Sequence, residues 1–442
     1  MGISVVLSVM FLVVYGATNY WASLRGGAGS FYMPVERQIP FLPIFILPYL
    51  SLDLFFVAAP FLTRGSKELR VLCMRIVMAI VVASLFFVAM PLKFGFQRPP
   101  SGDGGVVGNV FDHFRSLDLP YNEFPSLHIA LALILLETYW RRTRGVMRGT
   151  MALWFTLIFL SPIFTYQHHL IDIAGGTILG ALCLHLIQEE PLRRPFVRNA
   201  AVWRLYAVAG IAAGALAFVC VPYTLALLWP ALSLGLVAAG YLFWGPGIYR
   251  KREGRLGMTT WILLAPVLLG QWVSLFYYRK RSGAFDRVTA DILIGRRLNH
   301  RQAQELMALG VSAVLDLTAE FSEERHLRRA AYLQLPILDL TAPTAAQLQE
   351  AIAFIELHTR GPMMSGAPGM PRRAVYVHCK VGYSRTAAVV GAYLRSTGMD
   401  VPQVMAKLRE ARPGIMIRPE ALRMIECAGT TKLKTQNAEL ET

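Results

Sequence analysis

The sequence predicts a polytopic α-helical membrane bundle followed by a soluble α/β domain. Of its 442 residues, 55% are hydrophobic and only 16% are charged, and the mean hydropathy is positive. This composition lies outside the range of ordinary soluble proteins. The apolar excess falls before about residue 280, whereas the last third of the chain is mixed and charged. Two domains of different class follow, one embedded in lipid and one in water.

The charge and the cysteines exclude several other classes of protein. The net charge is +16, but Lys and Arg stand in short clusters between apolar runs, which is typical of loops at a membrane surface. The five cysteines are odd in number and form no Cys-x-x-Cys pair, so they indicate neither disulfides nor a zinc site. We therefore expect no nucleic-acid partner, no metal and no cofactor.

The membrane spans can be read from the apolar runs. A run of about 20 apolar residues crosses a bilayer as a helix, because only internal hydrogen bonds satisfy the backbone in hydrocarbon. The first run has almost no basic segment before it and no small-residue cleavage site, so we expect it to be a retained span. The candidate spans cover residues 3–22, 39–62, 71–92, 127–140, 151–167, 170–188, 203–221 and 224–244.

The basic loops predict the orientation of these spans. Clusters at residues 64–75, 141–148, 193–204 and 250–255 alternate as cytoplasmic connections under the positive-inside rule, which places the amino terminus inside. The long loop at 93–125 and the short one at 161–169 then share the opposite face.

Residues 257–278 can be interpreted in two ways. They are long enough to cross, and a crossing would place the soluble domain outside the cell. Pro266, Gln271, two threonines and the basic clusters on both flanks better suit a helix lying in the membrane interface. We favour the interfacial interpretation.

After residue 284 the long apolar runs give way to short alternating segments, which indicate an α/β domain. Short β-like runs at 291–294, 311–317, 332–337 and 374–377 alternate with helix-like stretches at 300–309 and 344–358. Helical patterns at 384–396, 401–411 and 418–427 follow, and the Gly/Pro-rich stretch at 361–373 is expected to be a loop. We expect a first membrane domain at 1–200, further spans and the interfacial helix at 201–283, the soluble domain at 284–430 and a polar tail at 431–442.

One loop of the soluble domain carries the groups for phosphate chemistry. The β-like run at 374–377 leads into His-Cys-Lys-Val-Gly-Tyr-Ser-Arg-Thr at 378–386, which an apolar helix follows. Such a loop points backbone N–H groups and the positive end of the helix dipole at one spot, which binds phosphate and favours a thiolate. We expect Cys379 to be the nucleophile and Arg385 to grip two phosphoryl oxygens. The other expected phosphate-binding residues are Lys380, Val381, Gly382, Tyr383, Ser384 and Thr386.

This His-Cys-x5-Arg-Thr signature resembles that of the cysteine-dependent phosphatases, and residues 284–430 resemble their dual-specificity branch. The resemblance implies an α/β cysteine-phosphatase domain with a phosphocysteine intermediate, in which Thr386 assists hydrolysis and His378 supports the thiolate. It also implies an upstream aspartate as general acid. Asp339 matches that aspartate, and Asp316, which also ends a β-like run, is the alternative.

Three segments of the membrane half carry polar residues where lipid disfavours them, at 93–99, 124–128 and 161–172, and all fall on one face. His168 and Asp172 are four residues apart, so on a helix the carboxylate lies one turn from the imidazole and fixes its tautomer. An imidazole oriented in this way is a nucleophile.

The other polar residues complete a phosphoryl-transfer site. We expect His128 to protonate the leaving oxygen and Arg98 and Lys93 to neutralise the phosphoryl charge, with Ser126 as a further phosphate contact. A divalent metal is disfavoured, because cations stand beside the histidines and these segments offer only the carboxylate of Asp172.

These segments resemble the three motifs of the type 2 phosphatidic acid phosphatase superfamily, over about residues 70–190. The resemblance implies that His168 becomes a phosphohistidine, Asp172 orients it and His128 is the acid, while His169 is a neighbour.

The motifs depart from the family pattern at three positions. Four residues rather than six separate Lys93 from Arg98, which makes Arg98 the better-supported phosphate contact. Leu127 replaces a glycine, a form that resembles the inositol phosphorylceramide synthase-like branch and favours phosphotransfer. Pro162 stands where an arginine is usual, and Arg115 is a candidate substitute.

The leading hypothesis is a bifunctional membrane phosphatase. A histidine-dependent lipid-phosphate phosphatase or phosphotransferase would face the periplasm or lumen, and a cysteine-dependent phosphomonoesterase, for a phospholipid or a phosphoprotein, would face the cytoplasm. The chain would reside in the inner membrane. One alternative is a head-group phosphotransferase whose product the cysteine domain dephosphorylates. Another is a transporter with a phosphate-sensing domain, against which the intact nucleophile loop argues.

Overall fold

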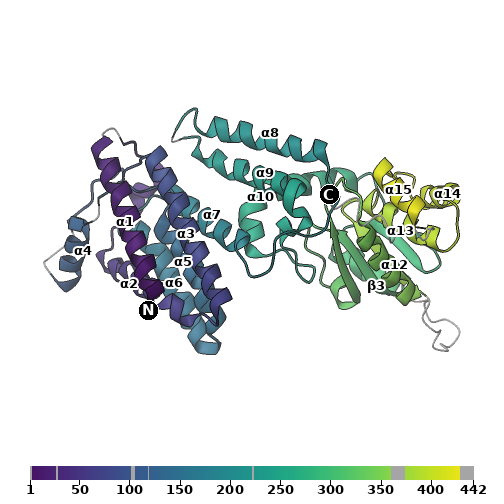
Figure 1. The fold of residues 1–442 in the computed structure, drawn as a ribbon, viewed down its shortest axis with the longest axis horizontal. Coiled ribbons are helices and arrows are strands. Elements are labelled where there is room, and N and C mark those ends of the chain that lie inside the picture. Colours follow the sequence, from purple (N-terminus) through teal and green to yellow (C-terminus); the bar gives the residue numbers. More distant parts are fainter. Residues whose placement is uncertain are drawn as a thin grey trace. The chain divides into compact units, whose positions relative to one another are not determined.

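The computed structural model describes residues 2–25, 28–100, 105–117, 119–221, 223–359 and 374–428. The chain forms two compact units (Figure 1). Unit 1 comprises Met1–Pro191 and Ala213–Trp229, and unit 2 comprises Leu192–Ala212 and Pro230–Thr442. The loop expected at 361–373 and the tail expected at 431–442 lie outside the described residues.

Unit 1 is a helical bundle. Its described helices are α1 (Gly2–Arg25), α2 (Ile46–Ala58), α3 (Ser66–Ala89), α4 (Val106–Leu117), α5 (Leu127–Arg142), α6 (Gly145–Phe164) and α7 (Leu170–Leu186). Buried aliphatic side chains of α3, α5 and α7 form its centre, among them Ile76, Ile80, Leu135 and Leu179. Helix α4 lies inside the segment that we expected to be a loop. Its apolar residues recur on one face only, so the search for continuous apolar runs missed it.

Helices α5 and α7 approach each other closely because α7 carries glycines at the contact. A Cβ on Gly176 would lie 2.3 Å from the Ser126 carbonyl oxygen, and one on Gly180 would lie 2.9 Å from the Ala130 carbonyl oxygen. Small residues at such positions let helix backbones meet, as in many membrane bundles. The same contact is fixed by the Ser126 N–H, which donates to the Asp172 carbonyl oxygen at 3.0 Å.

Unit 2 is built on a five-stranded sheet of order β1-β2-β5-β3-β4. The strands are β1 (Phe285–Thr289), β2 (Ile292–Arg296), β3 (Val311–Thr318), β4 (Ala331–Ile337) and β5 (Ala374–Cys379). Only β1 is antiparallel to its neighbour, and the other pairs are parallel. The sequence predicted β2 to β5 but missed β1. Every residue of the central strand β5 is buried, as expected for a parallel sheet covered on both faces.

Helices cover both faces of this sheet. They are α11 (His300–Ala308), α12 (Ala345–Thr359), α13 (Arg385–Ser396), α14 (Val401–Ala411) and α15 (Pro419–Cys427). Val375 and Val377 of β5 pack into the cluster with α12 to α15, whereas Tyr376 packs into the cluster with α11. This arrangement buries β5 and places Cys379 at the carboxyl end of the central strand, where α/β domains bind ligands.

Across the described residues, seven helical segments are long and apolar enough to cross a membrane. These segments and the α/β sheet confirm the predicted fold class. The segments are Gly2–Arg25, Pro43–Leu62, Ser66–Ala89, Gly145–Phe164, Ala200–Ala217, Leu225–Tyr249 and Met258–Arg279. The last three contain α8 (Ala200–Ala217), α9 (Leu228–Ala239) and α10 (Met258–Arg279).

The segment between α9 and α10 enters the sheet domain. Lys251 is buried, and its Nζ contacts the Asp316 carboxylate and donates to the carbonyl and hydroxyl oxygens of Thr318, both at 2.8 Å. Asp316 lies on β3 and is fully buried. The compact unit around the sheet thus begins well before residue 284, where we expected the soluble domain to start.

We predict that Lys251→Met destabilises the protein strongly. The change leaves the Asp316 carboxylate buried without its counter-charge, which costs about 3–5 kcal/mol. Thermal unfolding of the detergent-solubilised full chain, followed through the sheet domain, should show a clear loss of stability. The exposed Lys280 provides the matched control, and Lys280→Met should leave the transition nearly unchanged. Equal stability of the two variants would contradict the role assigned to Lys251.

Candidate active sites

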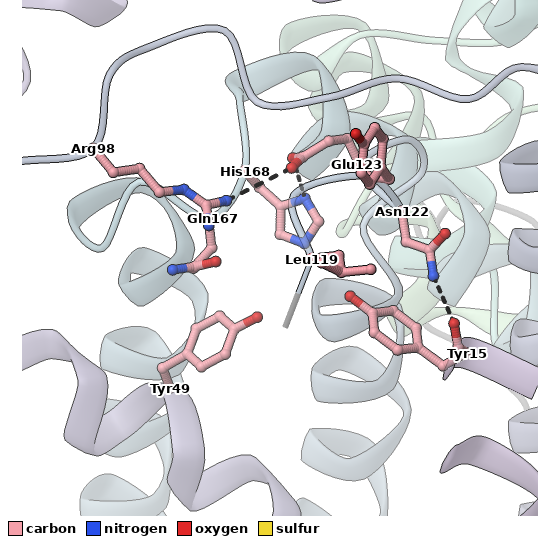
Figure 2. A pocket seen from close by; sticks show the side chains of 9 residues that line it. Tyr15, Tyr49, Arg98, Leu119, Asn122, Glu123, Gln167 and His168 are labelled. Carbon is pink, nitrogen blue, oxygen red and sulfur yellow. Dashed lines mark hydrogen bonds and ion pairs between the residues drawn. The ribbon is translucent and has the colours of Figure 1, made fainter. Parts of the chain in front are cut away.

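A polar pocket lies among the ends of the unit 1 helices (Figure 2). It is formed by tyrosine, amide and charged side chains from α1, α2, the two connections that flank α4 and the turn between α6 and α7. The lining residues are Tyr15, Tyr49, Arg98, Leu119, Tyr121, Asn122, Glu123, Gln167 and His168.

His168 faces two carboxylates. Its Nδ1 lies 3.3 Å from Oε2 of Glu123 and 3.8 Å from Oδ2 of Asp172. These contacts favour a proton on Nδ1 and leave Nε2 as the ring nitrogen that can attack a phosphorus atom. Burial by itself lowers the pKa of His168, but the two carboxylates outweigh burial and raise it.

The expectation that His168 and Asp172 share one helix is wrong in its geometry. Helix α7 begins at Leu170, and His169 is its N-cap residue. The Asp172 carboxylate accepts from the His169 N–H at 2.8 Å, so it caps the helix while it faces the preceding His168. The pairing of imidazole and carboxylate remains, although a turn rather than a helix carries the histidine.

Glu123 is a site residue that the sequence analysis missed. It is buried and lies between Arg98 and His168 (Figure 2), and its Oε1 is 3.9 Å from Nη2 of Arg98. Burial raises the pKa of Glu123, which makes it a candidate proton acceptor for His168. Its position just before the Phe124-Pro125-Ser126 motif was the available signal.

Glu123 also bears on the question of a metal. Ligand atoms of Glu123, His168 and Asp172 lie within 4.8 Å of one another, so the described residues offer a second carboxylate that the sequence analysis had not counted. The guanidinium of Arg98 beside Glu123 disfavours a divalent ion at this position.

Two arginines supply positive charge beside the pocket. Nε of Arg98 and Nε and Nη2 of Arg115 are buried donors with no hydrogen-bond acceptor among the described residues. Arg115 lies on α4 over the ring of Phe111, at 4.3 Å from its centroid, and donates from Nη1 to the Pro99 carbonyl oxygen at 2.7 Å. Burial and the nearby Arg98 lower the pKa of Arg115. An anion would satisfy both side chains.

Of the remaining predicted residues of this site, two lie at the start of α5, and Lys93 lies apart from the pocket. His128 lies in the first turn of α5 and stacks on Tyr49 with ring centroids 4.2 Å apart, and it is close enough to His168 for an electrostatic interaction. Ser126 is the N-cap of the same helix, and its hydroxyl accepts from the Ile129 N–H at 3.4 Å. Lys93, in contrast, is exposed and is not among the residues that line the pocket.

His169 is held away from the pocket by its own partners. Its Nδ1 contacts Glu36 at 2.8 Å, its Nε2 accepts from the Gly95 N–H at 2.9 Å, and its ring stacks on Phe94. Both ring nitrogens are therefore used in packing the turn, in agreement with its expected place as a neighbour of the site.

The second site lies at the carboxyl end of β5, where the loop after Cys379 leads into α13. The carbonyl groups of Lys380, Val381 and Tyr383 point outward. They accept from the Arg297 N–H at 3.2 Å, from Nη2 of Arg412 at 2.9 Å and from the Met416 N–H at 3.1 Å. In a trans peptide the N–H lies opposite the carbonyl, so the N–H groups of the residues that follow point inward.

Gly382 allows the loop to curl. Its φ is +81°, and a Cβ there would lie 2.5 Å from the Gly295 carbonyl oxygen on β2. Its N–H points at Cys379, with the nitrogen 3.2 Å from Sγ. The backbone thus forms a cup of inward N–H groups around the thiol, closed by Ser384 and the first turn of α13, where Thr386 is fully buried.

Arg385 is fixed over this cup by two acids. Its Nη2 and Nη1 contact the two carboxylate oxygens of Glu320 at 2.7 and 3.0 Å, and Nη2 also contacts Oδ1 of Asp339 at 3.1 Å. The other oxygen of Asp339 contacts Nζ of Lys380 at 2.6 Å. Glu320 could not be predicted as a site residue, because nothing in its local sequence links it to an arginine 65 residues later.

The two candidate general acids differ in their surroundings. Asp339 faces Arg385 and Lys380, and burial, which alone would raise its pKa, is outweighed by these two cations, which lower it. Asp316 is instead enclosed with Lys251, Thr318 and Tyr332, away from solvent. The geometry favours Asp339 as the residue that a substrate can meet.

The electrostatics of the cup favour a thiolate. Burial by itself raises the pKa of Cys379, but the Arg385 guanidinium and the donors of Thr386 and Gly382 outweigh it and lower the pKa. His378 is buried beneath the loop against Glu323. Burial lowers the pKa of His378, while Glu323 and Asp316 raise it further than burial lowers it.

Comparisons with known proteins assign both halves. Residues 44–186 match the model of the PAP2 superfamily, and residues 292–428 match that of the dual specificity phosphatase catalytic domain. A curated relative, the phosphatidylglycerophosphate phosphatase PTPMT2 of Arabidopsis thaliana, is 24% identical over 184 residues, which cover 40% of this chain and 76% of the relative.

Solved structures similar to this chain include PTPMT1, Tk-PTP and human DUSP28. PTPMT1 in complex with PI(5)P is 21% identical with a TM-score of 0.30, over 35% of this chain and 99% of that one. Tk-PTP in its active form is 24% identical with a TM-score of 0.29, over 33% and 96%. Human DUSP28 is 23% identical with a TM-score of 0.27, over 33% and 93%. By its two family matches, the chain is a phosphoric monoester hydrolase that joins a PAP2-superfamily membrane domain to a dual-specificity phosphatase catalytic domain.

Proposed function

We propose that the chain is a bifunctional membrane phosphatase with two independent phosphoenzyme sites. The observation that carries the proposal is the Cys379 cup, in which inward N–H groups and a doubly anchored Arg385 surround a thiol with a lowered pKa. Such a site binds a phosphoryl dianion and attacks it with sulfur.

The cysteine reaction has two steps. The Cys379 thiolate attacks phosphorus, the bond to the leaving oxygen breaks, and Asp339 gives that oxygen a proton. A water molecule then attacks the phosphocysteine, Asp339 takes up its proton, and thiolate and phosphate are released. The Thr386 hydroxyl, which lies beside Cys379, assists this second step.

Asp339 must be protonated to act as the acid, although the resting site favours its ionised form. A bound phosphoryl dianion changes this balance, because it takes up the donors of Arg385 and places negative charge beside Asp339. Both effects raise the pKa of the carboxyl. Substrate binding therefore prepares the acid.

The histidine reaction follows the same scheme with nitrogen as nucleophile. Nε2 of His168 attacks phosphorus, Asp172 and Glu123 stabilise the proton on Nδ1, and His128 protonates the leaving oxygen. The cations Arg98 and Arg115 neutralise the phosphoryl charge. Water then attacks the phosphohistidine and gives its proton to His128, and the bond between phosphorus and Nε2 breaks to release phosphate.

Substrates follow from the setting of each site. The relative from Arabidopsis is named for a phosphomonoester of a phospholipid, which supports a membrane lipid phosphomonoester for Cys379 over a phosphoprotein. A site among apolar helices supports a lipid phosphate or a polyprenyl pyrophosphate for His168. By the basic-loop count, His168 faces the periplasm and Cys379 the cytoplasm of an inner-membrane protein.

Phosphotransfer is the second candidate activity of the histidine site. Tyr15, Tyr49, Tyr121, Asn122 and Gln167 give the pocket a lining of uncharged donors and acceptors, which suits a polyol acceptor. With a phospholipid and inositol as substrates, formation of a new lipid supports transfer, and release of free phosphate alone supports hydrolysis.

Separate variants should silence separate substrates. We expect Cys379→Ser to lower phosphate release from phosphatidylglycerophosphate by on the order of 10⁴-fold, since it removes the nucleophile. We expect His168→Ala to spare that activity and to abolish release from a polyprenyl pyrophosphate. Malachite-green assays of both full-length variants on both lipids test this. Loss of both activities in either variant, with the fold intact, would refute independent sites.

The leaving group should reveal the role of Asp339. Asp339→Asn removes the proton donor, so turnover of an alkyl phosphate should fall by about 10²- to 10⁴-fold. Turnover of p-nitrophenyl phosphate should fall much less, because nitrophenolate departs without a proton. The half-buried Asp291, which directly precedes β2, is the matched control as Asp291→Asn. An equal loss on both substrates would argue against acid catalysis.

The thiol of Cys379 should ionise below the pH range of a free thiol. Its lowered pKa keeps the thiolate present as pH falls, so iodoacetamide should alkylate it at a pH where free cysteine reacts slowly. Thr386→Val removes one donor and should move the midpoint of alkylation to higher pH. Mass spectrometry of the Cys379 peptide measures both midpoints, and coincidence with free cysteine would contradict the assignment.

A further inference from the structure

Helix α10 touches the sheet domain at both of its ends. Just before it, the Gly254 carbonyl oxygen accepts from the Glu323 N–H at 2.6 Å, and the Leu256 N–H donates to the Ser322 hydroxyl at 3.0 Å. Near its end, Tyr278 packs edge-on against Tyr383 of the catalytic loop. A helix that crosses a bilayer separates its two ends by about 30 Å of hydrocarbon, so one folded domain outside the bilayer cannot hold both.

The outward face of α10 is nevertheless apolar. Trp261, Leu269, Val273 and Phe276 are exposed, with Leu269 and Val273 at 66% and 61%. A helix that rests on a water-soluble domain normally turns a polar face to solvent. An exposed apolar face of this kind fits the boundary between lipid head groups and acyl chains.

The inward face of α10 carries one buried amide, which meets the catalytic loop. Oε1 of Gln271 accepts from Nζ of Lys380 at 2.9 Å, and the same Nζ contacts the Asp339 carboxylate. Lys380 thus lies between the helix and the proposed general acid. Gln271, which argued against a membrane crossing, therefore contacts the proposed active site through Lys380.

The neighbouring membrane segments hold the acid loop as well. The Tyr241 hydroxyl, at the end of the α9 segment, donates to the Asp339 carbonyl oxygen at 2.7 Å. The Asn199 amide, just before α8, donates to the Leu340 carbonyl oxygen at 2.8 Å. Leu340 has a φ of +60°, a left-handed conformation that is unfavourable for a leucine and needs such support.

We propose that α10 does not cross the membrane but lies in one face of the bilayer, where it presents the Cys379 cup to the phosphomonoester head group of a lipid in the same leaflet. The choice of a lipid head group rests on the proposed function of Cys379. The placement of α10 rests only on its contacts and its exposed face. Substrate then reaches the cup by lateral diffusion, while Gln271 positions Lys380.

The placement is tested by labelling the two flanks of α10. In a full-length background with Cys220→Ser, which removes an exposed thiol, single cysteines are introduced as Gly257→Cys and Lys280→Cys. Leu357→Cys, on α12, marks the side of the sheet domain. We expect a membrane-impermeant maleimide to label all three from the same side of sealed vesicles. Labelling of residues 257 and 280 from opposite sides would overturn the proposal, whatever the enzyme does.

The lipid head group is tested by a charge on the outer face. We expect Val273→Glu to lower turnover of phosphatidylglycerophosphate in phosphatidylcholine vesicles by about tenfold, because the charge resists burial in the interface. Turnover of dissolved p-nitrophenyl phosphate should stay within about twofold. Leu357→Glu, at a similarly exposed leucine of α12, should change neither rate.

The outcomes separate the two claims. A parallel loss on both substrates in Val273→Glu, or an equal loss on vesicles in Leu357→Glu, would overturn the docking of the Cys379 cup on lipid. Failure of the wild-type chain to hydrolyse either compound would instead refute the proposed function, and the maleimide pattern would still locate α10.

Discussion

Charges that water cannot reach need a partner inside the protein, and both sites of this chain depend on such partners. The buried guanidinium of Arg385 is stable beside the Cys379 cup because Glu320 and Asp339 neutralise its charge. His168 keeps its orientation because Glu123 and Asp172 face the same ring nitrogen. In the first site carboxylates hold a cation in place until the phosphoryl group arrives, and in the second site carboxylates fix the Nδ1 proton of the nucleophilic imidazole. The acids that organise the sites therefore matter as much as the groups that meet substrate.

Local sequence predicted the parts of the molecule that are local in structure. The strand, the cysteine loop and the helix follow one another within nine residues, so their order along the chain was enough to predict the geometry of the loop. The long apolar segments are continuous apolar runs and were found for the same reason. The spans expected at 127–140 and 170–188 correspond to α5 and α7, which are not among the segments long and apolar enough to cross. Helix α4 and strand β1 are amphipathic or partly exposed, and apolar runs do not reveal them.

Partners that the fold brings together from afar were not predictable. Glu320 meets Arg385 across 65 residues, and Lys251 meets Asp316 across an equal distance. Lys251 also belongs to the basic cluster at 250–255, which was interpreted as a cytoplasmic loop. That interpretation gave no reason to expect a buried ion pair. The turn before α7 was misread because a spacing of four suits a helix and a capped helix start equally well.

The position of Lys251 also constrains the order in which the chain can be made. The turn that carries it leaves the ribosome before β3, so its ammonium group is present when the Asp316 strand is synthesised. The sheet cannot close around Asp316 without drawing this turn, and the ends of α9 and α10 with it, against the forming domain. Folding of the phosphatase domain therefore also fixes the ends of the two helices before it. A chain in which this turn is kept away from β3 would expose an unfinished sheet, and such partly folded states are prone to aggregation and proteolysis.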